Sequence, residues 1–256
     1  MSILERFSST EFFSDGLAPK LDLSAAERAL KAVLVVEPDS AVAVSLRASI
    51  RNLGFGSCYV ANDHVAALKY CREHPVTDVL FSVAETTLAA DAFVSHLIGD
   101  FHGVVPIALS NRSEVPLVLP LFRLGLRAYV GKPFTEETLE HALIAANLLD
   151  PIPQTVLTAE NRNTAFAAMI LGDLDRFLLC YRQAKEFETA RAELARRRAK
   201  LLYGVEVAHA LCEGSADDLT QALVDSAIEL AEKGTSRLGR LRRQLLETRQ
   251  GRREAE

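Results

Sequence analysis

A carboxylate and an ammonium group stand at the ends of two apolar runs in this sequence. Glu37 follows the run Val33–Val36, and Lys132 comes just after Ala128–Val130. Continuous apolar runs are typical of buried strands in a parallel sheet, and ligand or catalytic groups gather at the carboxyl ends of such strands. We therefore expect Glu37 and Lys132 at one edge of a sheet. There they could bind a ligand, or simply form an ion pair that holds the strand ends together.

The elements that would position these groups alternate between strands and helices. Apolar runs of strand length occur at 33–36, 58–61, 79–83, 104–109 and 128–130. Apolar residues at helical spacing predict helices near 40–53, 65–71, 90–101 and 139–149, with Thr135 as the N-cap of the last one. Residues 24–31 could add a short helix before the first strand. This alternation predicts an α/β fold, a flavodoxin-like doubly wound sheet of five parallel strands.

The segment Gly125–Phe134, which contains the sequence Lys132-Pro133-Phe134, resembles the last strand of a response-regulator receiver domain. The resemblance extends over residues 31–150. It implies that the lysine pairs with a phosphorylated aspartate, that the Lys-Pro bond is cis, and that two acidic residues after the first strand hold magnesium. It also implies that Ser110 is the phosphate-sensing residue of the fourth strand and that Tyr129 is the aromatic switch of the fifth.

The acidic residues that this resemblance requires after the first strand are incomplete. Glu37 occupies the first acidic position, but Pro38 occupies the second and has no carboxylate. Asp39 could replace it only if the loop shifts by one residue, and it could instead cap the next helix. Since magnesium prefers a shell rich in carboxylate oxygens, we expect no metal site and no cofactor here.

The phosphoacceptor itself is also absent. Asp78 matches the acidic residue that precedes the third strand in receivers, and counting from it places Val83 at the acceptor position. Glu85 comes two residues too late, and strand alternation turns Ser82 to the other face. The sequence therefore predicts a pseudo-receiver, in which Val83 packs against the neighbouring strand ends and fills the phosphate pocket.

The segment before the fifth strand contains Pro116 and Pro120. Proline is tolerated in the first turn of a helix, but Pro120 should break a regular fourth helix because it lacks a backbone N–H. We expect either a proline-shaped interaction surface or a merely irregular helix at this place.

Composition restricts the class of protein. The chain has 256 residues, of which 49% are apolar, and no run is long enough for a membrane span. Its four cysteines are widely spaced, which fits a reducing compartment better than disulfides or a zinc site. No nucleophile motif, phosphate loop or paired-carboxylate site points to an enzyme. We expect a soluble cytoplasmic protein without membrane contact.

Charge and pattern change near Pro151-Ile152-Pro153, which predicts an extended linker. The first 150 residues carry a net charge of −6, and the remainder carries +1. The predicted division is an N-terminal extension (1–30), a receiver-like domain (31–150), a linker (151–158), an α-helical domain (159–250) and a polar tail (251–256).

The C-terminal half shows only helical patterns. Residues 160–171 predict one helix, interrupted by Gly172-Asp173, and residues 174–212 predict a long one whose apolar positions alternate in steps of four and three. That spacing favours a coiled-coil or helical-hairpin seam, either packed within one chain or forming a homodimer through 174–212. Ser215 or Asp217 could cap a further helix with a buried stripe of Leu219, Leu223, Ile228 and Leu230. A last helix is expected near 238–246.

Two motifs in this half suggest other functions. The segment Ala208–Ser215 resembles the phosphorylatable-histidine motif of histidine phosphotransfer domains, with His209 as the acceptor, although Cys212 replaces the expected lysine. A pseudo-receiver followed by a small helical module is also similar to RNA-binding antiterminator regulators. Basic residues gather at 196–200 and 237–253, where they could contact phosphates or form a solvated helix face.

The sequence thus predicts a phosphorylation-independent signalling adaptor of bacterial two-component type. Its receiver-like half would present a fixed surface around residues 121–134 and its last helix to a signalling partner of unknown identity, and its helical half would dimerise or dock a second protein. One alternative is a nucleic-acid-binding regulator of the antiterminator type, and another is phosphotransfer through His209.

Overall fold

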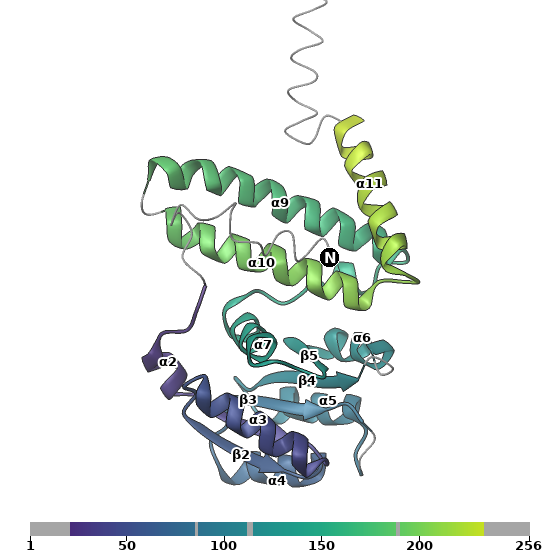
Figure 1. Cartoon of the computed structure of the whole chain (residues 1–256). Helices are drawn as coiled ribbons and strands as arrows, with labels where there is room; N and C mark the ends of the chain where they lie inside the picture. The colour runs from purple at the N-terminus through teal and green to yellow at the C-terminus, as the bar shows by residue number, and fades with distance from the viewer. Residues whose placement is uncertain (1–20, 85–86, 112–114, 188–189, 233–256) are drawn as a thin grey trace, which may run out of the picture. The chain divides into compact units, whose positions relative to one another are not determined.

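A computed structural model of the chain describes residues 21–84, 87–111, 115–187 and 190–232. These residues belong to two compact units, one that spans 21–158 and one that begins at Ala159 (Figure 1). Ala159 is also where the sequence predicted the start of the helical domain. None of the described helices is both long and apolar enough to cross a lipid bilayer.

The first unit is built on a parallel sheet of five strands. They are β1 (Ala32–Val36), β2 (Ser57–Ala61), β3 (Asp78–Ser82), β4 (Val105–Asn111) and β5 (Ala128–Lys132). Their order is β2-β1-β3-β4-β5, and every neighbouring pair is parallel. This is the flavodoxin-like doubly wound order, so the predicted fold class is confirmed. The apolar runs of β1 and β3 are buried because helices cover the sheet on both faces.

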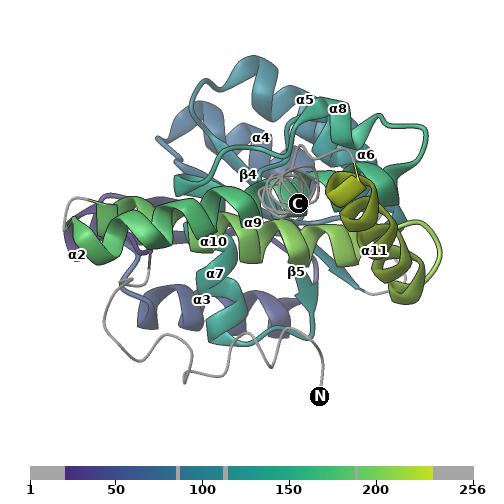
Figure 2. The ribbon, with the colours of Figure 1, turned by 90° about the horizontal axis from the view of Figure 1, so that it is seen from above.

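Two groups of helices cover the sheet. On one face lie α3 (Ser40–Asn52) and α7 (Glu136–Leu148), and on the other lie α4 (His64–Glu73), α5 (Ala90–Asp100) and α6 (Val115–Leu124) (Figures 1 and 2). The side chains of Asp39, Asp63 and Thr135 cap α3, α4 and α7 by accepting backbone N–H groups of the first turns. The predicted N-cap Thr135 is therefore confirmed.

Pro120 does not break the fourth large helix, contrary to the sequence-based expectation. Helix α6 continues from Val115 to Leu124 with Pro120 inside it. Pro120 is exposed, whereas Val118, Leu121 and Phe122 are buried against the rest of the unit. Burial of these side chains outweighs the one backbone hydrogen bond that a proline in a short helix gives up.

The first unit extends along the chain beyond both ends of the predicted receiver-like domain. Helix α2 (Ala25–Ala29) comes from the predicted N-terminal extension, and α8 (Gln154–Leu157) comes from the predicted linker. Ile152, Val156 and Leu157 are buried, and the carbonyl oxygen of Leu157 accepts a hydrogen bond from Arg123 on α6 at 2.9 Å. Residues 151–158 are therefore part of the packed unit, because their apolar side chains find a surface to bury.

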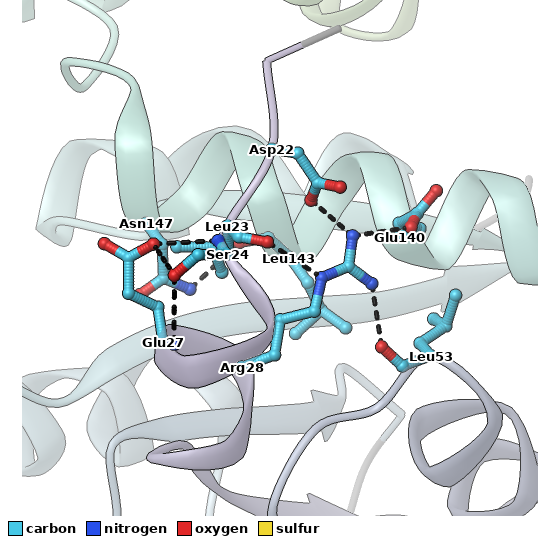
Figure 3. A network of polar contacts seen from close by, with 9 residues as sticks. All are labelled: Asp22, Leu23, Ser24, Glu27, Arg28, Leu53, Glu140, Leu143 and Asn147. Atoms are coloured by element: carbon cyan, nitrogen blue, oxygen red, sulfur yellow. Dashed lines mark hydrogen bonds and ion pairs between the residues drawn. The ribbon is translucent and has the colours of Figure 1, made fainter.

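Helix α2 is held by the guanidinium group of Arg28 (Figure 3). This group donates to the carbonyl oxygen of Leu53 at 2.7 Å and to the carboxylate of Glu140 on α7 at 2.7 Å, and it also pairs with Asp22. Close backbone approach adds a second constraint, since a Cβ at Gly56 would lie only 2.2 Å from the carbonyl oxygen of Ala29. Arg28 and Gly56 together fix α2 at the amino ends of the strands.

The second unit contains α9 (Arg162–Glu186), α10 (Ala190–Leu211) and α11 (Ala216–Glu232). The single long helix predicted for 174–212 is wrong, because the chain turns at Phe187 and α10 packs back along α9 (Figure 1). The predicted interruption at Gly172-Asp173 is also wrong, since α9 runs through both residues. Tertiary packing overrides the weak helix propensity of a single glycine.

The hairpin buries part of the predicted seam within one chain. Phe177, Cys180 and Ala184 of α9 form one cluster with Leu194 of α10. The predicted seam therefore follows a helical hairpin instead of one straight helix. Whether the same helices also form a homodimer stays a prediction.

The turn before α11 follows the expected capping pattern. Ser215 caps the helix through a reciprocal pair of hydrogen bonds with Asp218, as one of the two predicted caps. The predicted buried stripe is only partly present, since Leu219 is buried but Ile228 is 53% exposed. Among the described residues, no helix follows α11 that could cover Ile228. The predicted helix at 238–246, the arginines of 237–253, the tail and the first 20 residues lie outside the described residues.

Candidate functional site

The carboxyl ends of β1, β3 and β5 bring together an ion pair that the sequence predicted. Lys132, the last residue of β5, donates from Nζ to Oε2 of Glu37 at 2.6 Å. The Glu37 side chain is only 2% exposed and that of Lys132 14%. A buried carboxylate needs a partner of opposite charge, and Lys132 supplies it.

A third polar group of this site was placed wrongly by strand alternation. The sequence turned Ser82 to the other face, but Lys132 Nζ also lies 3.3 Å from Ser82 Oγ. In the sheet, Val36 pairs with Phe81, so that Glu37 and Ser82 follow at the same level of two neighbouring strands. Side chains at one level of adjacent parallel strands share a face. The register between β1 and β3 places Ser82 level with Glu37, and this register cannot be predicted from a single sequence.

At the positions that hold metal and phosphate in receivers, the side chains here either lack a carboxylate or use it for another contact. Pro38 is exposed and has no acidic group, and Asp39 caps α3 by accepting from the amides of Ala41 and Val42 at 2.8 and 3.3 Å. The Asp39 amide donates to Glu37 Oε1 at 3.2 Å, so the loop holds Asp39 away from the second acidic position. The shift by one residue that would place Asp39 there does not occur.

Val83 follows directly after β3 and is buried, with 3% of its surface exposed. Its amide donates to the carbonyl oxygen of Leu109 at 2.9 Å, so the backbone here is tied to β4. An aliphatic side chain can neither attack a phosphoryl group nor bind a metal ion. Glu85, the other candidate of this loop, lies outside the described residues.

Ser110 and Tyr129 lie on the neighbouring strands β4 and β5. Ser110 is fully buried, and its hydroxyl donates to the carbonyl oxygen of Asn111 at 2.9 Å. Tyr129 is half-buried and pairs in the sheet with Ala108. The peptide bond between Lys132 and Pro133 is cis, as the resemblance implied. Ser110 and Tyr129 therefore lie on adjacent strands, β4 and β5.

The magnesium ion of receivers does not fit this arrangement. Both oxygens of Glu37 are engaged, one by the Lys132 ammonium group and the other by the Asp39 amide. Pro38 and Val83 offer no oxygen from their side chains. Across the described residues, no three His, Cys, Asp or Glu side chains are grouped so that they could hold a metal ion. The charges of the site satisfy each other instead.

The candidate residues of the helical unit are separate from this chemistry. His209 is exposed in the last turn of α10, and its carbonyl oxygen lies 3.3 Å from Cys212 Sγ. Cys212 does not supply the cationic group expected beside a phosphohistidine, because a thiol carries no positive charge in either protonation state, and burial raises its pKa so that it stays neutral. In the basic stretch of α10, Arg197 pairs with Glu193 at 2.6 Å on the helix surface.

Comparisons with known proteins give matches in structure alone. No family model matches the sequence, and no curated protein matches it. Solved structures similar to part of the chain include a response regulator receiver domain protein from Clostridium thermocellum, with 17% identity and a TM-score of 0.43 over 46% of this chain and 94% of that chain. A chemotaxis protein from Vibrio cholerae has 19% identity and a TM-score of 0.41, over 45% and 97% of the two chains.

A further similar structure combines two kinds of domain. It is a two-component response regulator and GGDEF domain protein, with 18% identity and a TM-score of 0.45, matched over 48% of this chain and 51% of that one. The fold assignment itself rests on the strand order and pairing described above. Residues 21–158 form a flavodoxin-like α/β domain, and a helical unit follows it in the chain.

Proposed function

We propose that this protein is a phosphorylation-independent adaptor of two-component signalling, and that residues 21–158 are a pseudo-receiver. The observation that carries the proposal is the closed Lys132–Glu37 pair, together with the buried aliphatic side chain of Val83 directly after β3. In a phosphorylated receiver the lysine would have to contact the acyl phosphate. Here its ammonium group is already paired with a buried carboxylate, and no acceptor carboxylate lies among the described residues at the end of β3.

The Lys132–Glu37 pair holds the carboxyl ends of β1 and β5 in one arrangement. Breaking it would leave a charge in a site that excludes water, which costs about 3–5 kcal/mol in comparable buried pairs. The proposed adaptor is therefore not switched by covalent modification at this site. Any switching must come from a partner that binds one conformation more tightly than another.

The partner surface of this domain includes α6 and the segment that leads into α7. Two leucines of α6 are exposed although they are large and apolar, Leu117 at 53% and Leu124 at 41%. Such residues on one short helix favour contact with another protein. We assign this face to the signalling partner.

The helical unit supplies a second surface. Leu178 and Leu179 of α9 are 46% and 48% exposed, and Phe187 at the hairpin turn is 60% exposed. We assign these residues to dimerisation or to docking of a second protein. No catalytic step is part of the proposed function.

Phosphorylation assays test the central claim. Acetyl phosphate with magnesium should leave the wild-type protein unlabelled, because Val83 offers no nucleophile. The double variant Pro38→Asp with Val83→Asp should gain a base-labile acyl phosphate, whereas the matched variant Pro38→Asp with Val83→Asn should not. A base-labile phosphate on the wild-type protein would contradict the proposal.

Two other outcomes would replace the adaptor function. Binding of RNA or DNA that weakens steeply with added salt would establish a nucleic-acid regulator, since such binding releases counterions from the phosphates. Acid-labile label transferred from a phosphorylated receiver, and lost in His209→Gln, would establish phosphotransfer. Neither is expected for an adaptor.

A further inference from the structure

Helix α11 packs on α9 with one side and leaves an apolar stripe exposed on another (Figure 1). On the packed side, Leu219 and Ser226 are buried. Val224 is 48% exposed and Ile228 53%, and since they are four residues apart they lie one above the other on the helix surface. Two alanines continue the same side. The α11 stripe is made of Val224, Ala227, Ile228 and Ala231.

The charge of α11 restricts what can cover this stripe. The helix contains no lysine or arginine, and its five acidic residues are Asp217, Asp218, Asp225, Glu229 and Glu232. Asp225 precedes Ile228 by three residues and Glu232 follows it by four, so both carboxylates border the stripe. A second copy of α11 would bring like charges together. A segment with apolar and basic side chains fits instead.

The chain has such a segment directly after α11. Residues 233–256 lie outside the described residues, and the match is in their sequence. Leu238, Leu241 and Leu245 follow one another in steps of three and four, which is the spacing of one side of a helix. Between residues 237 and 249 there are five arginines and one acidic residue, Glu247. The segment therefore combines an apolar side with a strong positive charge.

The connection between α11 and these leucines is short. Only residues 233–237 separate Glu232, the last residue of α11, from Leu238. Gly234 is typical of the position after a helix end, and Ser236 is a good N-cap for a following helix. Helices joined by so few residues are usually antiparallel neighbours. The leucines are therefore kept close to the α11 stripe.

We propose that residues 238–246 form a helix that folds back on α11 and covers the α11 stripe within the same chain. Its leucines pack on Val224 and Ile228, and its arginines lie along the acidic side of α11. The basic cluster at the end of the chain thus has an internal acidic partner and is not kept for nucleic-acid phosphates. This proposal does not depend on the adaptor function or on phosphorylation.

Amide hydrogen exchange of the full chain tests the cover without any variant. A helix of nine residues alone is marginal in water, so protection of these amides requires packing. Amides of residues 241–246 should exchange at least roughly tenfold more slowly than in an unprotected chain. Exchange at the unprotected rate would overturn the proposal. Protection that depends on protein concentration, together with a dimeric mass, would also overturn it, because the cover would then come from a second copy.

A pair of matched variants tests whether the segment lies on the α11 stripe. Ile228→Gln removes an apolar side chain from the stripe, and Val44→Gln makes a similar change on α3, where Val44 is 69% exposed. Glutamine forms helices at least as well as isoleucine or valine, so both helices remain intact. In Ile228→Gln, exchange at 241–246 should rise roughly fivefold, because the leucines lose apolar contact.

Val44→Gln should leave this exchange as it is in the wild-type protein. No rise in Ile228→Gln would show that the segment packs elsewhere and would overturn the proposal. The reciprocal variant, Leu241→Gln with Leu245→Gln, should speed exchange in the last turn of α11, residues 229–232. An unchanged last turn in that variant would contradict the cover independently of Ile228.

Charge variants test the acidic side of the cover. Asp225→Asn with Glu232→Gln should raise exchange at 241–246 roughly twofold, as loss of surface charge pairs implies. Neutralising Glu232 does not weaken α11 itself, since an acidic group at a helix C-terminus is unfavourable. Asp100→Asn, which removes a surface acid of α5, is the control and should have no effect. Equal exchange in the charge variant and the control would overturn the pairing of the arginines with α11.

Discussion

The two ends of the sheet carry buried charges in different ways. At the amino end, Asp78 is fully buried and has three partners, since it accepts from Asn147 at 2.7 Å and from Thr77 at 2.6 Å and lies 3.7 Å from Lys31. At the carboxyl end, Glu37 has one charged partner, Lys132.

The amino end of a parallel sheet is normally structural, and the carboxyl end normally holds the ligand. In this protein both ends are closed by internal pairs. The comparison shows that the buried carboxylate at the carboxyl end has fewer hydrogen-bond and charge partners than the one at the amino end.

The amino end should give the largest loss of stability. Asp78→Ala removes the acceptor of Thr77 and Asn147 and leaves Lys31 without its carboxylate. We expect the free energy of unfolding to fall by about 3–5 kcal/mol, as for other broken buried pairs. Urea denaturation followed by circular dichroism measures this change.

Asp100→Ala is the matched control, because Asp100 pairs with His96 at the surface. It should cost less than about 1 kcal/mol. A cost for Asp78→Ala as small as that of the control would break the comparison, since the amino end would then not be the stronger joint.

The carboxyl end should respond next. Lys132→Met leaves the buried Glu37 carboxylate without its charged partner, while the Asp39 amide still donates to it, and we expect a loss of about 3 kcal/mol. The double variant Lys132→Met with Glu37→Met should recover most of this loss, because it leaves no unpaired charge. Denaturation of both variants measures the difference. No recovery in the double variant would mean that the pair does more than neutralise a buried charge.

Helix α2 should contribute less than either buried carboxylate. Arg28→Met keeps an unbranched side chain but removes the guanidinium group, which lies over the Phe55 ring and donates to Leu53 and Glu140. We expect a loss of about 2 kcal/mol, since hydrogen bonds from charged groups are worth about 1.5–3 kcal/mol. Arg47→Met on the exposed face of α3 is the control and should be near neutral. Equal thermal stabilities for the two variants would show that α2 is not fixed by Arg28.

The local parts of this molecule could be predicted from the sequence, because they depend on short-range patterns. The strands follow continuous apolar runs, Thr135 was recognised as a cap, and Glu37 was paired with Lys132. The failures concern long-range packing. Nothing near Phe187 signals a turn, and Pro120 lies in a helix because burial of its neighbours compensates for it.

The same reason explains the residues of the site that sequence reasoning missed. Ser82 shares a face with Glu37 only because of the register between β1 and β3. His64 is a lone histidine in the sequence, and its contacts with two carbonyl groups and a phenylalanine come from other elements. Neither relation has a local signature.

The smallest expected effect is a difference between the helix caps at the two ends of the sheet, in how their contribution to stability changes at acidic pH. Ser24 caps α2 at the amino end together with Glu27, and Thr135 caps α7 at the carboxyl end together with Thr138. Hydrogen bonds from the Ser24 hydroxyl and amide hold the pKa of Glu27 below its ordinary value of 4.5. The part of the Ser24 cap that depends on the Glu27 carboxylate therefore contributes fully above that value and is lost as the pH falls through the lowered pKa, whereas the Thr135 cap has no group that titrates there.

Thr135→Ala should cost about 1 kcal/mol at every acidic pH at which the protein folds. Ser24→Ala should destabilise more at neutral pH than in acid, because protonated Glu27 no longer acts as the charged acceptor of the Ser24 hydroxyl, although the Ser24 oxygen still caps the Glu27 amide. Denaturation of both variants from pH 7 to about pH 3 measures the two profiles. Parallel profiles would contradict the assignment, since they would mean that ionisation of Glu27 adds nothing to the joint at the amino end.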